Sequence, residues 1–296
     1  MQPGNNTVTP LVSVIAVNFN NAAVTAELLA SVRENSYPAI EMIVVDNASS
    51  EDPTLLLQAA MPEVRVVRSQ ENLGFAGGNN LGIQAATGEY LFFVNNDTEF
   101  TDGLVEGLLE IFAAFPDAGM ASPKIRYFFQ KDTIQYAGYH AVNRLTGRNT
   151  MIGSREVDQG QHDAVAETPY GHGAAMMVPR TALEKTGLMP EVYFLYYEEL
   201  DWCEQFRRKG YKIYYQYKSL IYHKESMTTG KSSPMKTYYL TRNRLLFMRR
   251  NIALPARFLF MCYFSIFAIP KNTLQYLLKR ETVHLKAFWR GIRWNL

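Results

Sequence analysis

Residues 90–97 read YLFFVNND and are the most informative stretch for the fold. The apolar half predicts a strand that is buried on both faces, which is typical of parallel strands in an α/β sheet. The strand ends in two amides and a carboxylate, Asn95, Asn96 and Asp97. Asn and Asp are common in turns, and ligands also bind where the strands of open α/β sheets end. Both a turn and a ligand site therefore fit these three residues.

Strands and helices alternate on the N-terminal side of this stretch. Residues 11–19, 41–52 and 64–69 begin as short apolar, β-branched runs, and helical patterns separate them. This alternation predicts an open α/β sheet, mostly parallel and flanked by helices.

The alternation lapses further along the chain. Residues 127–170 are polar and rich in Gly, Asn and Thr, so we expect them to be irregular. A helix that ends at Gly210 and a strand over Lys212–His223 follow. We expect a loop over residues 224–234 after that strand.

Polar side chains follow all four N-terminal strands, namely Asn18, Asp46, Asn72 and the run Asn95–Asp97. One such residue is readily explained as part of a turn. Because the carboxyl ends of parallel strands meet at one edge of a sheet, four in succession predict a ligand site at that edge.

A glycine-rich stretch, NLGFAGGNNLG over residues 72–82, follows the third strand. It matches neither the dinucleotide pattern GxGxxG nor the P-loop pattern GxxxxGK[ST]. Its position before a predicted helix suits the approach of a phosphate to backbone amides. A purely structural turn explains it equally well.

Three carboxylates, Glu198, Glu199 and Asp201, lie within one turn of the helix that ends at Gly210. Carboxylates that repel one another beside aromatic side chains bind protons more tightly, which suits a general base near neutral pH. Acids also favour the first turn of a helix because of its dipole. Both interpretations remain open.

His223 ends the last predicted strand. A lone histidine is more often structural than a ligand. Together with Asp97 from another strand end, it forms a candidate site for a divalent metal, with substrate phosphate oxygens as the remaining ligands. A site with a single carboxylate is expected to hold its metal weakly until the phosphate oxygens of a substrate complete the ligand set.

The composition is that of an ordinary globular protein, with 296 residues and a net charge of +2. Two cysteines, Cys203 and Cys262, form neither a disulfide framework nor a metal cluster, which fits a reducing cytoplasm. The first ten residues lack the features of a signal peptide.

The charge is unevenly distributed along the chain. Residues 241–296 carry eleven Lys and Arg against one acid, a local balance of +10, which leaves −8 for the first 240 residues. A basic tail of this kind indicates an anionic partner, either nucleic acid or a membrane surface.

The tail also contains an apolar run over residues 258–270, which is 13 residues long. A membrane-spanning helix needs roughly 20 apolar residues, so this run is expected to be too short to cross a bilayer. We expect helices that lie in the membrane interface, and an apolar run favours a membrane over nucleic acid. A helical cap on the main domain is the alternative. The expected domains are residues 1–235 and a C-terminal extension over 236–296.

An ordered set of motifs resembles the family 2 glycosyltransferases with the GT-A fold, especially the bacterial rhamnosyltransferase-like branch. The matching pieces run from about residue 11 to 250: VSVIAVNFN, IVVDNASSED, ENLGFAGGNNLGI, YLFFVNNDTEF, GAAMMVPRTALEKTGL, FLYYEELDWCEQFRRKGY and YYLTRNRLLFMRRN. The resemblance implies an inverting transferase that takes a sugar from a nucleotide-diphosphate donor. It implies dTDP-rhamnose as donor and a lipid-linked or polysaccharide acceptor in cell-surface glycan synthesis.

The resemblance also implies roles for individual residues. Asp97 would bind Mg or Mn at the position of the family's DxD motif, and His223 would be a further metal ligand. Asn96 stands where that motif often has another of its positions. Glu199 would be the catalytic base, with Asp201 as the alternative because Glu stands where Asp is usual. Donor-binding roles fall to Asn18, Asp46, Gly77, Gly78, Asn79, Asn96 and Arg242.

Arg242 and Asn243 lie where processive relatives carry QxxRW, and the absence of that sequence argues against a polymerising synthase. Two alternatives remain: a UDP-sugar donor (galactofuranose, a hexose or an amino sugar) on the same fold, or a non-catalytic sugar-binding protein. The expected location is the cytoplasm, peripheral on the inner face of the cell membrane.

Overall fold

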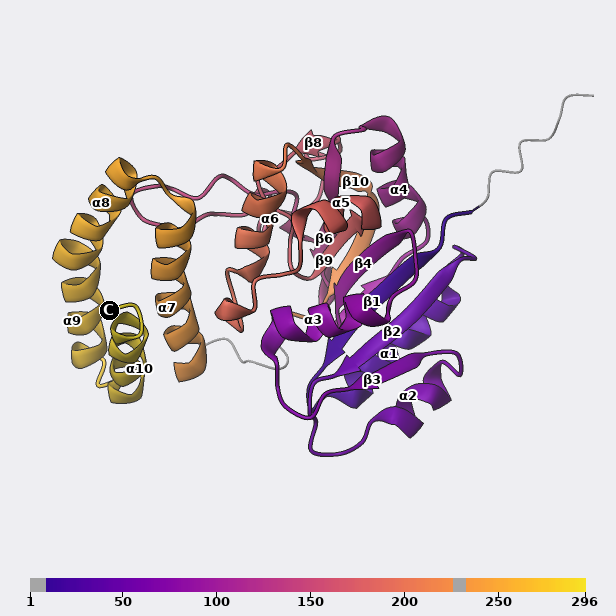
Figure 1. Ribbon diagram of the computed structural model, residues 1–296, viewed down its shortest axis with the longest axis horizontal. Coiled ribbons are helices and arrows are strands. Elements are labelled where there is room, and N and C mark those ends of the chain that lie inside the picture. The colour runs from indigo at the N-terminus through magenta and orange to yellow at the C-terminus, as the bar shows by residue number, and fades with distance from the viewer. Residues whose placement is uncertain (1–8, 226–232) are drawn as a thin grey trace, which may run out of the picture.

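The computed structural model describes residues 9–225 and 233–296, so most of the loop expected over 224–234 lies outside the described residues. One mixed sheet forms the centre of the larger, right-hand part of the molecule (Figure 1). Its strands follow the order β3 (Arg65–Arg68), β2 (Ile40–Asp46), β1 (Val12–Asn18), β4 (Tyr90–Asn95), β9 (Ala175–Pro179), β6 (Ala118–Tyr127), β10 (Lys212–His223) and β5 (Thr98–Phe100).

The first four strands in this order pair in parallel, as the alternating pattern predicted. Strands β9 and β5 pair antiparallel to their neighbours and extend the sheet beyond β4. Parallel pairing returns between β6 and β10. The predicted α/β sheet is thus confirmed, with an antiparallel component in its second half.

Both faces of the sheet are covered, which explains the continuous apolar run that ends at Asn95. Phe92 packs in the core cluster under α1 (Ala22–Glu34), α2 (Thr54–Ala60) and α4 (Leu104–Ala114). Phe93 points to the opposite face, under α3 (Gly74–Ala85), α5 (Arg180–Thr186) and α6 (Glu198–Arg208). There its ring meets the edge of Trp202 at 5.4 Å between centroids. Successive strand residues therefore bury on alternate sides.

Residues 127–170 are more regular than expected, and the prediction of an irregular segment was wrong for part of it. Strand β7 (Gln130–Tyr136) pairs antiparallel with β6, and β8 (Ala166–Glu167) pairs with β10. The sequence of β7, QKDTIQY, begins with exposed polar residues and buries only its last three side chains. An edge strand of this kind has little apolar pattern by which it can be recognised.

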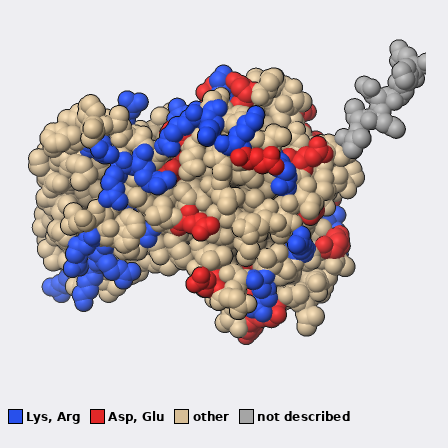
Figure 2. Space-filling view, viewed as in Figure 1, with Lys and Arg blue, Asp and Glu red and all other residues tan. Residues whose placement is uncertain are grey.

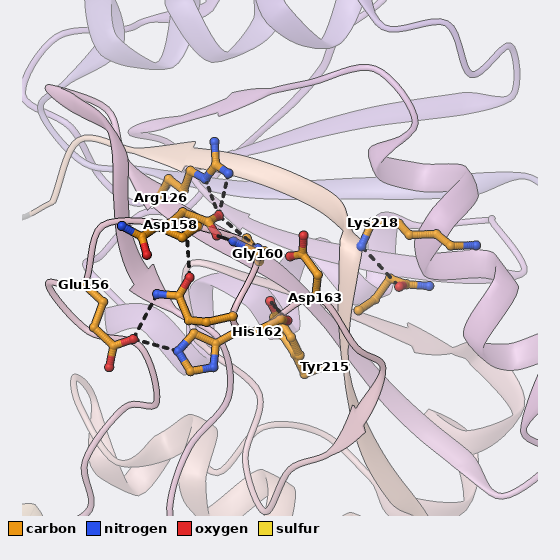
Figure 3. A network of polar contacts seen from close by, with 12 residues as sticks. Arg126, Glu156, Asp158, Gly160, His162, Asp163, Tyr215 and Lys218 are labelled. Atoms are coloured by element: carbon orange, nitrogen blue, oxygen red, sulfur yellow. Dashed lines mark hydrogen bonds and ion pairs between the residues drawn. The ribbon is translucent and has the colours of Figure 1, made fainter.

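A network of ion pairs ties the loop after β7 to the sheet (Figure 3). Asp158 accepts from Nζ of Lys124 at 2.9 Å and from Nε of Arg126 at 2.8 Å, and Lys124 also contacts Asp163. The side chains of Lys124 and Asp158 are almost completely buried. These contacts fix the part of the chain that lies over β6 and β10.

The C-terminal extension consists of α7 (Pro234–Asn251), α8 (Leu254–Tyr263), α9 (Ile269–Leu278) and α10 (Thr282–Arg293). It forms the left-hand part of the molecule in Figure 1. Asn243 of α7 is fully buried and donates to the carbonyls of Tyr193, Leu195 and Tyr196 at 2.7–2.9 Å. These bonds anchor the extension on the segment that precedes α6.

Helices α8 and α9 form one continuous helix because a π-helical turn, η2 (Phe264–Ala268), joins them. The widened turn ends at Ala268, two residues before Pro270, which then lies near the start of α9 rather than ending the helix. The continuous helix Leu254–Leu278 has 25 residues and is long and apolar enough to cross a membrane by length and composition. The expectation of a run too short for this was wrong, because it treated Pro270 as the end of the segment.

Candidate functional site

Asn18 and Asp46 meet at the carboxyl edge of β1 and β2, where both are fully buried. Nδ2 of Asn18 donates to Oδ1 of Asp46 at 2.9 Å, and Thr25 donates to Oδ1 of Asn18 at 2.8 Å. The other carboxylate oxygen of Asp46 accepts from Nε of Arg68 at 3.1 Å. The two predicted residues thus form one network with fixed orientations.

Asn96 joins the same network from the end of β4. Its Nδ2 donates to Oγ1 of Thr25 at 2.9 Å, so Thr25 links Asn96 to Asn18. The polar residues that follow the first, second and fourth strands are therefore connected, as the strand-end pattern predicted.

Asp97 and His223 also lie together. The chain turns after β4 so that β5 pairs antiparallel with β10, with Thr98 opposite His223. This register leaves Oδ1 of Asp97 3.1 Å from Nε2 of His223, and both side chains are buried. Burial raises the pKa of the Asp97 carboxyl, but the hydrogen bond and charge of His223 outweigh it and lower the pKa overall.

The geometry of this pair suits a divalent cation. In an octahedral Mg²⁺ site with ligands at 2.0–2.1 Å, neighbouring ligand atoms lie about 3 Å apart. The separation between the two side chains is 3.1 Å. No group of three or more His, Cys, Asp or Glu that could hold a metal occurs among the described residues, so the remaining ligands would come from water or substrate.

The glycine stretch has a different conformation from the one expected. It forms the first two turns of α3 instead of a loop before a helix. A Cβ at Gly78 would lie 2.9 Å from Val17 of β1, and one at Gly77 would lie 2.7 Å from Leu73. Gly77 and Gly78 therefore allow α3 to pack closely on its neighbours.

The amides at the start of α3 also have partners. The N–H of Gly74 donates to Asn72, and the N–H of Phe75 donates to the carbonyl of Phe194. Asn79 is buried and bonds to the carbonyl of Phe75 within the helix. Among the described residues, no side-chain hydrogen bond joins Asn79 to Asn18, Asp46 or Asn96, and a Cβ at Gly78 would lie 3.5 Å from Nδ2 of Asn47, the residue after Asp46.

The three acids of α6 lie in different environments. Glu198 is buried, and one of its carboxylate oxygens has no hydrogen-bond partner among the described residues. Burial and the charge of Glu199 raise its pKa well above the usual value. Glu199 is half-buried and lines a pocket, and burial raises its pKa to about 7. Glu199 is therefore the acid of this turn that combines access to a pocket with a near-neutral pKa.

Asp201 is fully buried and does not line this pocket. Oδ2 accepts from the hydroxyl of Tyr193 and from Nε of Arg250, each at 2.6 Å. Oδ1 accepts from Gln205 at 3.3 Å. Its carboxylate therefore joins α6 to α7.

The pocket beside Glu199 has a volume of about 490 Å³ and lies between the sheet domain and the extension. The loop residues Arg148 and Asn149, Tyr196 and Tyr197, and side chains of α7, η2, α9 and α10 line it. A space of this size can hold a substrate in contact with the Glu199 carboxylate.

Arg242 lies apart from the strand-end network. Its guanidinium contacts the carbonyl of Val192 and donates to Asn243 at 2.8 Å. It also lies 4.2 Å from the ring centroid of Trp294 in the segment that follows α10. These contacts join α7 to the C-terminal residues.

Three residues near the Asp97–His223 pair were not predicted from the sequence, namely Gln135, His172 and Gly173. Gln135 of β7 lies 2.8 Å from Nδ1 of His223, and the His172 ring lies 6.2 Å from that of His223 and stacks on Tyr139. Burial and the charge of His223 lower the pKa of His172 to about 3. A Cβ built on the next residue, Gly173, would lie 3.8 Å from Cγ of Glu199, so the segment of His172 and Gly173 lies between His223 and Glu199.

Comparisons with known proteins match this arrangement. The family model described as "Glycosyl transferase family 2" matches residues 13–187. The "Low-salt glycan biosynthesis hexosyltransferase Agl10" of Haloferax volcanii is 26% identical over 79% of this chain and 74% of its own length. The "N-acetylglucosaminyl-diphospho-decaprenol L-rhamnosyltransferase" of Mycobacterium tuberculosis is 23% identical over 75% and 79%.

Solved structures share the fold. A mannosyltransferase of Pyrobaculum calidifontis in complex with GDP-Man and Mn²⁺ matches with a TM-score of 0.61 at 16% identity, over 98% of this chain and 88% of that one. TarS of S. aureus, residues 1–349 with UDP-GlcNAc, matches with a TM-score of 0.59 at 16% identity, over 96% and 81%. The fold is the GT-A fold of nucleotide-sugar transferases.

Proposed function

We propose that this chain, which belongs to glycosyl transferase family 2, moves one L-rhamnose from dTDP-rhamnose to a hydroxyl of a lipid-linked glycan. Membership of the family implies an inverting glycosyltransferase with a nucleotide-sugar donor. Our proposal concerns the identity of the donor sugar and of the acceptor. The observation that carries it is the position of Glu199. This residue lines the pocket and lies beside Gly173, whose neighbour His172 lies beside His223 of the Asp97–His223 pair.

The proposed reaction is a single displacement. Glu199 takes the proton of the acceptor hydroxyl, whose oxygen attacks the anomeric carbon from the face opposite the diphosphate. The bond from that carbon to the diphosphate breaks, and the nucleoside diphosphate leaves. Asp97 and His223 would hold a divalent cation, which would supply positive charge against the charge that develops on the diphosphate. Asn18 and Asp46 hold the nucleoside at the edge of β1 and β2.

We assign the base to Glu199 rather than Asp201. The Asp201 carboxylate has three partners and is fully buried, whereas Glu199 lines the pocket. With a pKa near 7, much of Glu199 is ionised at neutral pH and can accept a proton. It is also a stronger base than a carboxylate with the ordinary pKa of 4.5.

The rhamnose donor rests on the relative named as a rhamnosyltransferase, at 23% identity. Structural neighbours hold GDP-Man or UDP-GlcNAc, so a UDP-sugar stays the alternative. Hydrolysis or transfer measured across dTDP- and UDP-sugars, with and without Mn²⁺, tests the proposal. Turnover of dTDP-rhamnose above every UDP-sugar is expected, and preference for a UDP-sugar would replace the donor assignment.

We further propose that the extension binds the inner face of a membrane peripherally. The outer side of the helix Leu254–Leu278 exposes large apolar side chains, among them Phe258, Ile266 and Phe267, each more than 60% exposed. Basic side chains lie over both parts of the molecule in this view, whereas the acidic ones gather over the sheet domain (Figure 2). Apolar and basic groups together suit an anionic lipid surface.

Packing within the extension favours a helix along the membrane over one that crosses it. The inner side of Leu254–Leu278 packs beside α7, where Arg244 lies 5.2 Å from the Phe264 ring centroid. Helix α10 packs on α7 through Thr237 and His284, whose polar atoms are 2.8 Å apart. A helix with two charged helices along one side has only its outer side available to lipid.

A further inference from the structure

Arg244 of α7 is a buried cation without an anion. Only 6% of its surface is exposed, and Nε donates to the carbonyl of Thr146 at 2.6 Å. Its guanidinium lies against the rings of Phe260 and Phe264. None of the ion pairs formed by the described residues involves Arg244, and residues 1–8 and 226–232 contain no acid. Buried charges in proteins are normally paired. Arg244 has no anionic partner among the described residues.

Two more cations line the same pocket, Arg148 of the loop and Lys236 of α7. Neither forms an ion pair within residues 9–225 and 233–296. Among the described residues that line the pocket, Glu199 is the single acid. Burial lowers the pKa of Arg244, and the charge of Arg148 lowers it further, so the two cations repel one another across the space. A pocket with three cations and one acid attracts an anion.

We propose that this pocket binds the diphosphate of a lipid-linked acceptor, with Arg244 and Arg148 as its main ligands and Lys236 as a third. The inference rests on the proposed function and deepens it, because it assigns the acceptor's anionic group to named residues. Guanidinium groups bind phosphate oxygens in pairs, which suits them to a diphosphate. With its diphosphate held there, the acceptor has its sugar within reach of Glu199, which lines the same pocket.

The surroundings favour a lipid-linked diphosphate. Phe264 lines the pocket and belongs to η2, and its neighbours Ile266 and Phe267 are 64% and 62% exposed on the outer side of that turn. The exposed apolar side chains that a prenyl chain requires therefore belong to the same turn as a residue of the pocket lining. The donor's diphosphate belongs to the Asp97–His223 pair, and neither of those residues lines this pocket.

The contrast with Arg242 shows which arginine is available. Both arginines belong to α7 and both are buried. The Arg242 guanidinium has the carbonyl of Val192, Asn243 and the Trp294 ring as partners, and it does not line the pocket.

Binding of farnesyl diphosphate tests the proposal without any donor. The calorimetric titration is done in the presence of a chelator, so that a metal at Asp97 does not contribute to the binding of the diphosphate. We expect wild type to bind and both Arg244→Met and Arg148→Gln to weaken binding by about tenfold to a hundredfold, since each removes charged hydrogen bonds. Arg148 is exposed, so its variant does not disturb the fold. Arg293→Gln, an exposed arginine of the extension outside the pocket, is the matched control and should bind as wild type does.

Further arms distinguish the source of the phosphate. Farnesol should not bind measurably, and inorganic diphosphate should bind more weakly than farnesyl diphosphate. Vesicles that contain phosphatidylglycerol should bind Arg244→Met as well as wild type. Equal affinity of wild type, Arg244→Met and Arg148→Gln for farnesyl diphosphate would overturn the proposal. Inorganic diphosphate that binds as tightly would overturn the lipid-linked source, and loss of vesicle binding alone would indicate a lipid headgroup site.

A second measurement separates this inference from the proposed function. Transfer to an alkyl glycoside, which has no diphosphate, should have the same KM in wild type and Arg148→Gln, while the KM for a prenyl-diphosphate glycoside should rise in the variant. Failure of both acceptors with every nucleotide sugar would contradict the proposed function but leave the titration valid. Transfer to both acceptors with KM values that the variant does not change would contradict only the diphosphate site.

Discussion

Oε1 of Gln135 lies 2.8 Å from Nδ1 of His223, so this amide oxygen accepts a hydrogen bond from the ring, while Nε2 faces Asp97 at 3.1 Å and Nδ2 of Asn95 at 3.3 Å. Partners of this kind fix the tautomer of a metal-binding histidine, and their loss commonly weakens metal affinity by about tenfold to a hundredfold. We expect Gln135→Leu to weaken Mn²⁺ binding in the presence of dTDP by about tenfold, and Asp97→Ala to weaken it further. Manganese titration followed by EPR measures both; affinities equal to wild type in the two variants would remove the pair from the metal site.

Glu199→Gln should lower transfer by about a hundredfold to ten-thousandfold while donor affinity stays within a few-fold, because the amide cannot accept the proton. Because the base acts when ionised and its pKa is about 7, kcat/KM of wild type should rise about tenfold per pH unit below pH 7 and level off above it. Rates at pH 5–9 measure this. Glu204→Gln, on the same helix, is the control and should keep the profile; a wild-type rate that does not change with pH would exclude Glu199 as the group that titrates.

Asp201→Asn should act on stability. Its carboxylate is fully buried and accepts from Tyr193 and from Arg250, whose side chain is 42% exposed, so the loss of these charged hydrogen bonds should cost about 1–3 kcal/mol. We expect a lower Tm with kcat per folded molecule close to that of wild type, measured by thermal unfolding and by rates at low temperature. An unchanged Tm combined with loss of activity would move the base from Glu199 to Asp201.

Asp158→Asn should change the acid stability of the protein. Burial raises the pKa of Asp158, but the hydrogen bonds from Lys124, Arg126 and the amide of Gly160 outweigh it and lower the pKa to about 2, below its ordinary value of 3.8. A lowered pKa in the folded state stabilises the protein above about pH 4, and this stabilisation is lost as the pH falls toward 2. The Tm difference between wild type and variant should therefore be constant at pH 5–8 and shrink below pH 4. Asp102→Asn, at an exposed position that forms no ion pair among the described residues, is the control; a difference that does not depend on pH would contradict the assignment.

The double variant Ile266→Ser/Phe267→Ser should weaken binding to phosphatidylglycerol vesicles. Each side chain is more than 60% exposed, so its removal costs little folding stability but takes apolar surface from the membrane contact. Co-sedimentation with vesicles and circular dichroism measure the two effects. Leu55→Ser, which replaces an exposed apolar residue of the sheet domain, should bind like wild type. Undiminished binding of the double variant would contradict the membrane contact on this side.

Some of the site could be inferred from sequence because strand ends are visible as the points where apolar runs stop. Asn18, Asp46, Asn96 and Asp97 all end such runs, and the parallel sheet brings them to one edge. His223 could be added because it ends the last predicted strand.

Other parts depend on contacts between distant segments. Gln135 comes from an edge strand whose polar sequence has no strand pattern, and it reaches His223 only through the pairing of β7 with β6 and of β6 with β10. The difference between Glu199 and Asp201 arises from Arg250, 49 residues further along the chain than Asp201. Arg244 belongs to a helix whose composition suggests an exposed basic face, and it is buried because the helix Leu254–Leu278 packs over it.

The packing of α10 on α7 has a consequence for membrane topology. Since Leu254–Leu278 lies along the bilayer in the proposed arrangement, the catalytic sheet and the end of α10 are on the same side of the membrane. A fluorescent reporter fused after Leu296 would then share a compartment with the active site. The lengthened lipid would remain in the leaflet where its sugar was added, and its transfer to the opposite leaflet would require a separate transporter.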